Sequence, residues 1–513
     1  MNNIGRWNGA LGLIAMAFVA CAETPDDVAV DEETTLAQEA LGHDRHGRGP
    51  RLRAPLSATI STSRRPLLRW FGARGDTVQI EICRDRDCDH HIVTFSADGN
   101  SARPPHALPA GTVFWRVTEG DRHRHGGSSA VWQLVIPARE SGRPGSWGAV
   151  PDVNGDGISD LAVTVLATGA PPPPNELRIF PGRHGGPAST PAQTFQGGDG
   201  FGFSSGAVGD LDGDGFSDLA VWSGLVSPNT VSVFRGGPNG VSPSVVFTTP
   251  AVTPGAQAFV VPAGDVNSDG YGDMLVGGDA YAQLFLGGPA GVHTTAAQNL
   301  SSLNTNSQWV VGGADFNGDG FPDAIVASTT FGGQIFYGDG RTLVPAGAFQ
   351  TQFPGVAGDV NADGFADLAD YTVNTGGPDG PINNFQAVAG TFARITAGDT
   401  NRDGFSDVLT SVDPIVGVPE SLRVYFGGKV GCTSNACDRF VAILAPGTLQ
   451  GDNIAYGAAG VGDVNADGYD DVAVFIPGNG VVHLLYGSRN GTSPTPSKTI
   501  TAEQGFGFSV AHL

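Results

Sequence analysis

An acidic nine-residue segment, DLDGDGFSD at residues 210–218, constrains this chain more than any other feature because it recurs throughout the C-terminal part. Every copy fits the pattern D-x-[DN]-x-D-G-x-x-D. The seven copies, called the Asp loops below, begin at Asp152, Asp210, Asp265, Asp315, Asp359, Asp399 and Asp463, at spacings of 58, 55, 50, 44, 40 and 64 residues. Self-similarity at such intervals predicts a repeat architecture, in which each copy belongs to one structural unit that packs on its neighbours.

The residue types in each Asp loop are those that a calcium site needs. Positions 1, 3, 5 and 9 offer side-chain oxygens, the Gly at position 6 permits a sharp turn, and position 7 can ligate through its carbonyl. We therefore predict about seven structural Ca²⁺ ions, with side-chain ligands at Asp152, Asn154, Asp156, Asp160, Asp210, Asp212, Asp214, Asp218, Asp265, Asn267, Asp269, Asp273, Asp315, Asn317, Asp319, Asp323, Asp359, Asn361, Asp363, Asp367, Asp399, Asn401, Asp403, Asp407, Asp463, Asn465, Asp467 and Asp471.

Position 7 is apolar or aromatic, which fits a residue that ligates only through its backbone. We expect its side chain to enter the core at Ile158, Phe216, Tyr271, Phe321, Phe365, Phe405 and Tyr469. An EF-hand is the weaker alternative, because it requires flanking helices and a Glu at position 12. The Asp loops instead run into strand-like segments such as DLAV and DVAV.

Composition supports a turn-rich all-β protein and explains the acidity. The chain has 513 residues with 77 Gly and 35 Pro, interrupted by short strand-like runs. Residues 146–513 hold 34 acidic and 11 basic side chains, a balance of −23, and 22 of those acids occupy the predicted ligand positions of the Asp loops. The negative charge therefore belongs to the predicted metal sites, and we expect no nucleic-acid partner.

The N-terminus predicts export. Residues 1–21 form a signal peptide with an apolar run too short to span a bilayer comfortably. Residues 18–21, FVAC, resemble a bacterial lipoprotein processing site, which would make Cys21 the lipidated residue; cleavage after Ala22 by ordinary signal peptidase is the alternative. Residues 22–52 are an acidic, then His- and Arg-containing segment that we predict to be a disordered linker.

The four remaining cysteines form two C-x4-C pairs. In an exported protein this pattern predicts disulfides between Cys83 and Cys88 and between Cys432 and Cys437. A zinc site is the alternative, but the two pairs are far apart and lack the usual C-x2-C spacing.

Residues 53–139 differ in character from the repeats. Short alternating strands at 66–70, 77–82, 91–95, 112–117 and 130–136 predict a small β-sandwich with Trp70 and Trp115 in its core. The segment LPAGTVFWRV at 108–117 resembles fibronectin type III-like domains of secreted bacterial proteins.

Residues 146–513 hold the repeats, and their motifs extend beyond the Asp loops. A strand precedes each loop, often opened by an aromatic-Gly pair as at 201–204, and a later strand ends in a Gly turn as at 234–240. These repeats resemble FG-GAP repeats, the calcium-binding blade motif of integrin alpha-subunits and of many bacterial surface proteins. The resemblance implies an all-β fold with a seven-bladed β-propeller, preceded here by the sandwich.

The last residues bear on how the ring of blades closes. The chain ends in GFGFSVA at 505–511, a strand of the type that precedes an Asp loop, but no loop follows it. We expect this strand to complete the first blade. An unfinished eighth repeat is the alternative and would leave an unpaired sheet edge.

We predict a non-enzymatic surface protein for binding or adhesion, acting as a monomer on a protein or glycan ligand. It would be exported to the bacterial outer membrane or cell surface, attached only through its lipid, or else secreted. The alternative is a polysaccharide-active lyase or hydrolase, which would need Arg178, Arg235, Arg423, Glu176, Asp199, Asp279 and Glu420 to converge. A purely structural envelope protein is a third hypothesis.

Two short motifs carry little weight in this choice. The sequence GFSSG at 202–206 matches a nucleophile elbow, but that elbow requires a strand, a sharp turn and a helix. The tripeptide RGD at 74–76 lies between two predicted strands of the sandwich, and three-residue matches are common by chance.

Overall fold

The computed structural model describes residues 49–72, 77–119, 127–141, 143–166, 174–224, 228–250, 258–278, 281–300, 308–328, 332–349, 354–370, 372–381, 392–412, 421–429, 440–443, 457–476, 480–502 and 506–510. Within these ranges every regular element is a strand, so the all-β prediction is confirmed. The predictions for Cys21, the Cys432–Cys437 pair and the RGD tripeptide lie outside the described residues.

Nine strands form two sheets, which together are called the N-terminal sandwich here. One sheet has the order β1-β3-β6 and the other β5-β4-β7-β8-β2-β9. The bounds are β1 Arg51–Ala54, β2 Thr59–Ser61, β3 Leu68–Phe71, β4 Thr77–Cys83, β5 His91–Asp98, β6 Ser101–Ala102, β7 Gly111–Glu119, β8 Trp132–Ile136 and β9 Ser146–Trp147. Thus β1 begins inside the predicted linker and β9 inside the predicted repeat region, while the proposed domain limits themselves stay predictions.

Alternation along these strands sends one set of side chains between the two sheets. Trp70 from β3 and Trp115 and Trp132 from β7 and β8 are each 1% exposed, which confirms the predicted core positions of Trp70 and Trp115. The rings of Trp115 and Trp132 meet edge to face with centroids 6.1 Å apart, a favourable aromatic geometry. On the other face of the larger sheet, Phe114 packs with the Cys83–Cys88 disulfide, which was predicted and is present.

Seven further sheets, called the repeat sheets, follow along the chain. Their strand orders are β12-β11-β10-β36, β13 to β16, β17 to β20, β21 to β24, β25 to β27, β28 to β31 and β32 to β35. The bounds are β10 Leu161–Val165, β11 Asn175–Phe180, β12 Gln193–Gly197, β13 Phe201–Gly209, β14 Asp218–Ser223, β15 Thr230–Arg235, β16 Ser242–Thr248, β17 Phe259–Gly264, β18 Asp273–Gly278, β19 Tyr281–Phe285, β20 Gln298–Asn299, β21 Gln308–Ala314, β22 Asp323–Ser328, β23 Gly332–Gly338, β24 Leu343–Phe349, β25 Gly355–Gly358, β26 Asp367–Ala369, β27 Val373–Asn374, β28 Phe392–Gly398, β29 Asp407–Val412, β30 Ser421–Tyr425, β31 Phe440–Ile443, β32 Ala458–Gly462, β33 Asp471–Ile476, β34 Val481–Leu485, β35 Lys498–Thr501 and β36 Phe506–Val510.

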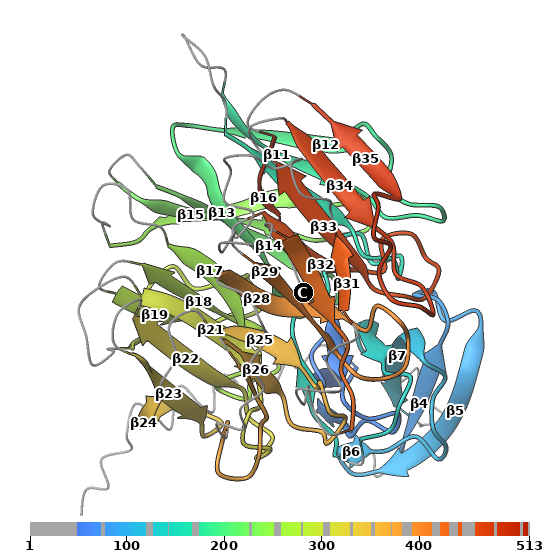
Figure 1. Ribbon diagram of the computed structural model, residues 1–513. Helices are drawn as coiled ribbons and strands as arrows, with labels where there is room; N and C mark the ends of the chain where they lie inside the picture. Colours follow the sequence, from blue (N-terminus) through green and yellow to red (C-terminus); the bar gives the residue numbers. More distant parts are fainter. Residues whose placement is uncertain are drawn as a thin grey trace, which may run out of the picture. The chain divides into compact units, whose positions relative to one another are not determined.

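The repeat sheets succeed one another as a cycle. The first strands β13, β17, β21, β25 and β28 each contact the first strand of the next sheet, up to β32 of the last (Figure 1). The C-terminal β36 pairs antiparallel with β10, contacts β13 of the second sheet and contacts β33 of the last. The C-terminal strand therefore completes the first sheet, as expected from its sequence. Seven sheets in cyclic succession agree with seven blades, a number that stays a prediction.

Closure by β36 predicts a specific effect of truncation. Deleting residues 506–513 leaves the edge of β10 without its neighbour, with unpaired backbone groups, and should lower the unfolding midpoint by about 10 °C. Differential scanning calorimetry measures the change. Deleting eight residues of the predicted linker, 30–37, is the matched control and should leave the midpoint unchanged. Equal midpoints for both deletions would contradict a closing role for β36.

Candidate functional site

The second to seventh Asp loops each join the first strand of a repeat sheet to the second, whereas the first loop follows β9 of the N-terminal sandwich and leads into β10. In the second to seventh loops, position 9 is itself the first residue of the second strand, as Asp218 is of β14. In the first loop, Asp160 directly precedes β10. The repeated pattern therefore corresponds to one repeated place in the fold, at the same end of every repeat sheet.

The position 9 carboxylate has the same two partners in all seven loops. Its Oδ2 accepts the backbone N–H of position 2, and its Oδ1 accepts a glycine N–H at or just after the end of the third strand. These bonds measure 2.7–3.1 Å, and each of the seven carboxylates is at most 1% exposed. Position 9 therefore links the start of the loop to the turn that follows the third strand.

The other acidic positions turn toward the inside of the loop. In the second loop, Asp210 accepts the N–H groups of Asp214 and Gly215, at 3.1 and 2.8 Å, and Asp214 accepts the N–H of Phe216 at 3.0 Å. The position 1 carboxylate accepts the N–H of the position 6 glycine in all seven loops. These backbone hydrogen bonds thus hold the carboxylates of positions 1 and 5 on the inside of the loop.

The second loop brings three carboxylates within reach of one hard divalent cation. Oxygen atoms of Asp210, Asp212 and Asp218 lie within 4.8 Å of one another, and theirs is the one group of three such ligands found in the described part of the chain. An all-oxygen donor set of this kind suits Ca²⁺. This loop is also the one with Asp rather than Asn at position 3, and Arg235 at the end of β15 forms an ion pair with that Asp212.

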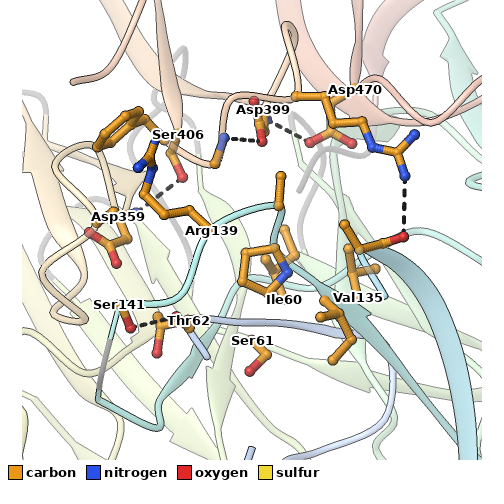
Figure 2. A pocket seen from close by; sticks show the side chains of 18 of the residues that line it. Ile60, Ser61, Thr62, Val135, Arg139, Ser141, Asp359, Asp399, Ser406 and Asp470 are labelled. Carbon is orange, nitrogen blue, oxygen red and sulfur yellow. Dashed lines mark hydrogen bonds between the residues drawn. The ribbon is translucent and has the colours of Figure 1, made fainter. Parts of the chain in front are cut away.

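The Asp loops also hold neighbouring repeat sheets together. The N–H of position 8 donates to the carbonyl of position 1 in the preceding loop at six of the seven junctions, from Ser159, Ser217, Gly272, Ala366, Ser406 and Asp470. The bond from Ser159 to Asp463 links the first loop to the last. At the remaining junction position 8 is Pro322, which has no N–H to donate. Side chains reinforce two junctions, because Ser406 and Asp470 accept the N–H groups of Asp359 and Asp399 (Figure 2).

Burial of these acids without a cation opposes their ionisation. Burial, with repulsion from the position 5 carboxylate, raises the pKa to about 7 at Asp152, Asp265, Asp359 and Asp399 and to about 6 at Asp315. Burial likewise raises the pKa of the position 9 residue Asp323 to about 8. Without a cation, the folded protein therefore favours the neutral form of these acids over the carboxylates that a metal site needs.

The expected core position of the position 7 side chains is confirmed at two loops and wrong at five. Phe365 and Phe405 are buried, at 6% exposure each, but the other five are only half-buried. Four of the rings carry a guanidinium of the N-terminal sandwich on their faces: Arg86 on Phe216, Arg51 on Tyr271, Arg143 on Phe365 and Arg139 on Phe405. Sequence reasoning missed these arginines, because the repeat pattern contains no signal for a partner outside the repeats.

Where the structure describes them, the residues that a catalytic pocket was expected to gather lie on or beside different repeat sheets. Arg178 pairs with Glu176 on β11, and Arg235 pairs with Asp212. Asp199 lines a groove between the outer strands of the first and second repeat sheets. Asp279 and Glu420 lie outside the described residues.

Comparison with known proteins bears on the repeats. A family model described as an FG-GAP-like repeat matches residues 152–221 and 265–326. This chain carries FG-GAP-like repeats. Integrin alpha-6 of Gallus gallus is 35% identical over 114 residues, which are 19% of this chain and 10% of the integrin, so the match spans about a tenth of that relative. The repeat prediction is confirmed and the repeat region is a β-propeller, whereas the fibronectin type III-like and lipoprotein features stay predictions.

Comparison with solved structures finds distant likenesses. The rhamnogalacturonan lyase PL11 of Bacillus licheniformis has a TM-score of 0.38 at 12% identity, covering 86% of this chain and 76% of its own. The exotype rhamnogalacturonan lyase YesX has a TM-score of 0.37 at 12% identity, covering 86% and 75%. A Lactobacillus plantarum protein has a TM-score of 0.42 at 12% identity, covering 69% and 99%.

These neighbours correct one prediction. The sequence-based prediction excluded an enzyme, and this exclusion is wrong because two of these neighbours are lyases. Few ionisable residues outside the Asp loops had motivated that exclusion, but the number of such residues in a repeat region does not decide whether a fold supports catalysis. The likeness itself is too distant to indicate any reaction for this chain.

The raised pKa values predict how the metal-free protein responds to pH. An unfolded Asp titrates near pH 4, so between about pH 4 and 8 the folded, calcium-free chain binds more protons than the unfolded chain. Its stability should therefore fall as the pH rises through this window. Scanning calorimetry in EDTA should show the midpoint falling from pH 5 to pH 8, whereas excess Ca²⁺ should abolish the decline. The same slope with and without Ca²⁺ would contradict the prediction.

The ion pair in the second loop predicts an effect on calcium affinity. Arg235→Gln removes the guanidinium that occupies Asp212, so Ca²⁺ should bind there about tenfold more tightly, equivalent to about 1.4 kcal/mol. Competition with a chromophoric chelator measures the change. The double variant Asp212→Asn with Arg235→Gln, which restores the pattern of the other loops, serves as the control and should reverse the gain. Weaker binding in Arg235→Gln would show that Arg235 supports the site.

Proposed function

We propose that this chain is an exported, calcium-binding protein of the cell surface, whose FG-GAP repeat region is a seven-bladed β-propeller that binds a protein or glycan ligand. Its Ca²⁺ ions, about one in each Asp loop, have a structural role. The observation that carries the proposal is the shared bonding of the seven loops, which turns carboxylates inward and buries them at the junctions between repeat sheets. Buried negative charge of this kind requires a compensating cation.

The residues of each Asp loop have different roles. Positions 1, 3, 5 and 9 and the carbonyl of position 7 would hold the ion. When bound, calcium supplies the positive charge that lets these oxygens lie close together. Position 9 meanwhile keeps both of its backbone hydrogen bonds, since each carboxylate oxygen has a second lone pair. Position 8 links the loop to its neighbour, so a fixed loop also fixes the junction.

Export and surface attachment follow from the N-terminal sequence and the repeats. The signal peptide, lipidation at Cys21 and a second disulfide between Cys432 and Cys437 belong to this proposal. The partial match to an integrin also supports an extracellular or cell-surface location. In the described part of the chain, no helix has the length and hydropathy needed to cross a membrane.

Calcium removal tests the proposal directly. Excess Ca²⁺ should raise the unfolding midpoint by more than about 10 °C relative to EDTA, and the dialysed protein should hold close to seven ions by elemental analysis. Replacing Asp359 and Asp363 in the fifth loop by Asn should remove about one ion. Asp379→Asn, an exposed acid outside the loops, is the matched control and should remove none. No bound calcium and no shift of the midpoint would refute the proposal.

A further inference from the structure

The N-terminal sandwich contacts the Asp loops through their backbone carbonyls. Arg86 donates from Nε to Gly155 O at 2.8 Å and from Nη2 to Gly215 O at 2.9 Å. Further bonds run from Ser57 to Gly215 O, Thr112 to Gly157 O, Trp132 to Gly213 O and Arg139 to Asp403 O. All of these acceptors lie at positions 4 to 6 of the first, second and sixth loops.

Each of these five carbonyls shares a rigid peptide group with an N–H that points into the loop. Gly215 O belongs to the peptide whose N–H, on Phe216, donates to Asp214 at 3.0 Å. The peptides that begin at Gly155, Gly157, Gly213 and Asp403 likewise donate to Asp152, Asp156, Asp210 and Asp399. Because a peptide unit is planar, the position of the inner carboxylate sets the direction of the outer carbonyl.

The aromatic residue at position 7 gives the sandwich a second type of contact. Guanidinium carbons of Arg86, Arg143 and Arg139 lie 4.1–4.4 Å from the ring centroids of the second, fifth and sixth loops. The N–H of each of these aromatic residues donates to the position 5 carboxylate. The stacked ring therefore also depends on the arrangement of the acids inside the loop.

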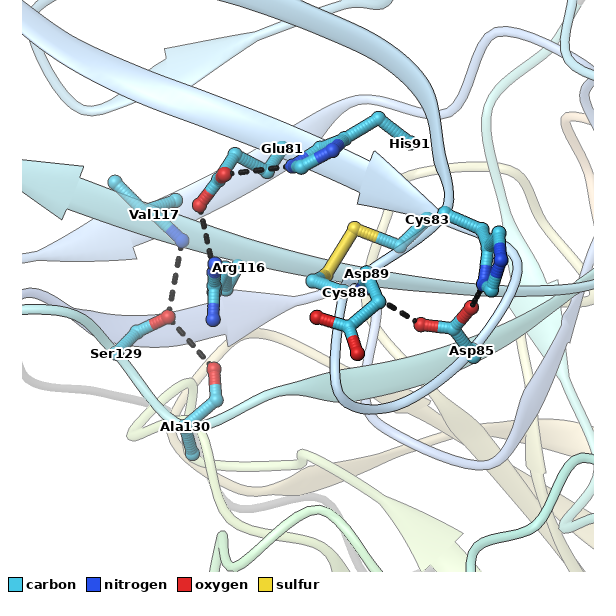
Figure 3. The surroundings of a disulfide bond; sticks show 11 residues. Glu81, Cys83, Asp85, Cys88, Asp89, His91, Arg116, Val117, Ser129 and Ala130 are labelled. Carbon is cyan, nitrogen blue, oxygen red and sulfur yellow. Dashed lines mark hydrogen bonds and ion pairs between the residues drawn. A yellow bond between two sulfur atoms is a disulfide. The ribbon is translucent and has the colours of Figure 1, made fainter.

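A short covalent loop holds Arg86 in place. The Cys83–Cys88 disulfide closes the segment that contains Arg86, and both cysteines are buried (Figure 3). Arg86 also donates to Val131 O at 3.0 Å, beside β8.

At the fifth to seventh loops, Figure 2 shows Thr62, Ser141 and Arg139 facing the side of a cavity that Asp359, Asp399 and Asp470 line.

We propose that docking of the N-terminal sandwich on the Asp loops is coupled to calcium binding in them, so that each event favours the other. This inference rests on the proposed function. Repelling carboxylates in a calcium-free loop turn the peptide groups away from the directions that Arg86, Ser57 and Thr112 require. Calcium fixes the carboxylates and with them the outward carbonyls. By thermodynamic linkage, the docked sandwich strengthens calcium binding by the same factor.

The partners of Arg86 make this coupling positive rather than competitive. Its hydrogen bonds to the loops go to the outward carbonyl oxygens of Gly155 and Gly215, so it does not occupy the carboxylates, although its charge acts on Asp152 and Asp210 from outside the loops. Arg235 differs, because it contacts the carboxylate of Asp212 itself. Loss of Arg86 should therefore weaken calcium binding, whereas loss of Arg235 should tighten it.

The test compares three variants of the full mature chain by calcium titration and by hydrogen exchange of residues 84–90 and 210–218. In Arg86→Ala, calcium binding to two loops should weaken about tenfold, a typical coupling factor, and residues 84–90 should exchange faster even with Ca²⁺. Arg139→Ala repeats the test at the sixth loop if Arg86→Ala fails to fold. Arg84→Ala, an exposed neighbour, should change neither measurement. In the wild type, EDTA should release both segments together.

Two results would overturn the coupling. One is that residues 84–90 stay protected from exchange in EDTA although the ions have left. The other is that Arg86→Ala binds calcium at least as tightly as the wild type. Each of these leaves calcium binding itself intact, so the proposed function would survive. A wild type that binds no calcium would instead refute the proposed function and this coupling with it.

Discussion

The repeat region depends on a buried carboxylate that bonds to two backbone N–H groups. At position 9 of every Asp loop, one oxygen holds the start of the loop and the other holds the turn beyond the third strand. Charge-assisted bonds of this kind are stronger than those between neutral groups, and burial keeps water from competing with them. The same carboxylate brings a negative charge into the interior at every junction. The bond that organises a repeat sheet is therefore also the reason why we propose a cation in each loop.

The periodic part of this organisation could be predicted from sequence, because one residue pattern occupies one structural place seven times. The Asp loops, the strands around them and the pairing of the C-terminal strand with β10 all follow from that repetition. The glycines that donate to position 9 lie in or beside the Gly turn already seen in the sequence, as Gly236 does at 234–240, but the pattern does not reveal that their N–H groups bond to that carboxylate. The interblade bond from position 8 was equally hidden, because any residue except proline can make it.

Contacts between the N-terminal sandwich and the Asp loops could not be predicted from the sequence either. The position 7 rings have the size and polarity of core residues, and a core position was the natural expectation. Four of them instead stack against arginines between residues 51 and 143, in a region with no repeat in register with the loops. Arg235 is different, because a charged residue at that position and the extra carboxylate of Asp212 occur together only in the second repeat. That coincidence was visible in the sequence and indicates a compensating pair.

Repetition also separates the parts of the propeller that maintain the fold from those that can give specificity. The Asp loops lie at one end of the strands, where they are nearly identical and where the N-terminal sandwich contacts several of them. Because antiparallel strands alternate in direction, the connections between second and third strands lie at the opposite end. Those connections differ in every copy, from nine residues with four consecutive prolines at 166–174 to two residues at 279–280. A ligand that distinguishes this protein from other propellers has to contact what is not repeated, so we expect its binding surface at that opposite end.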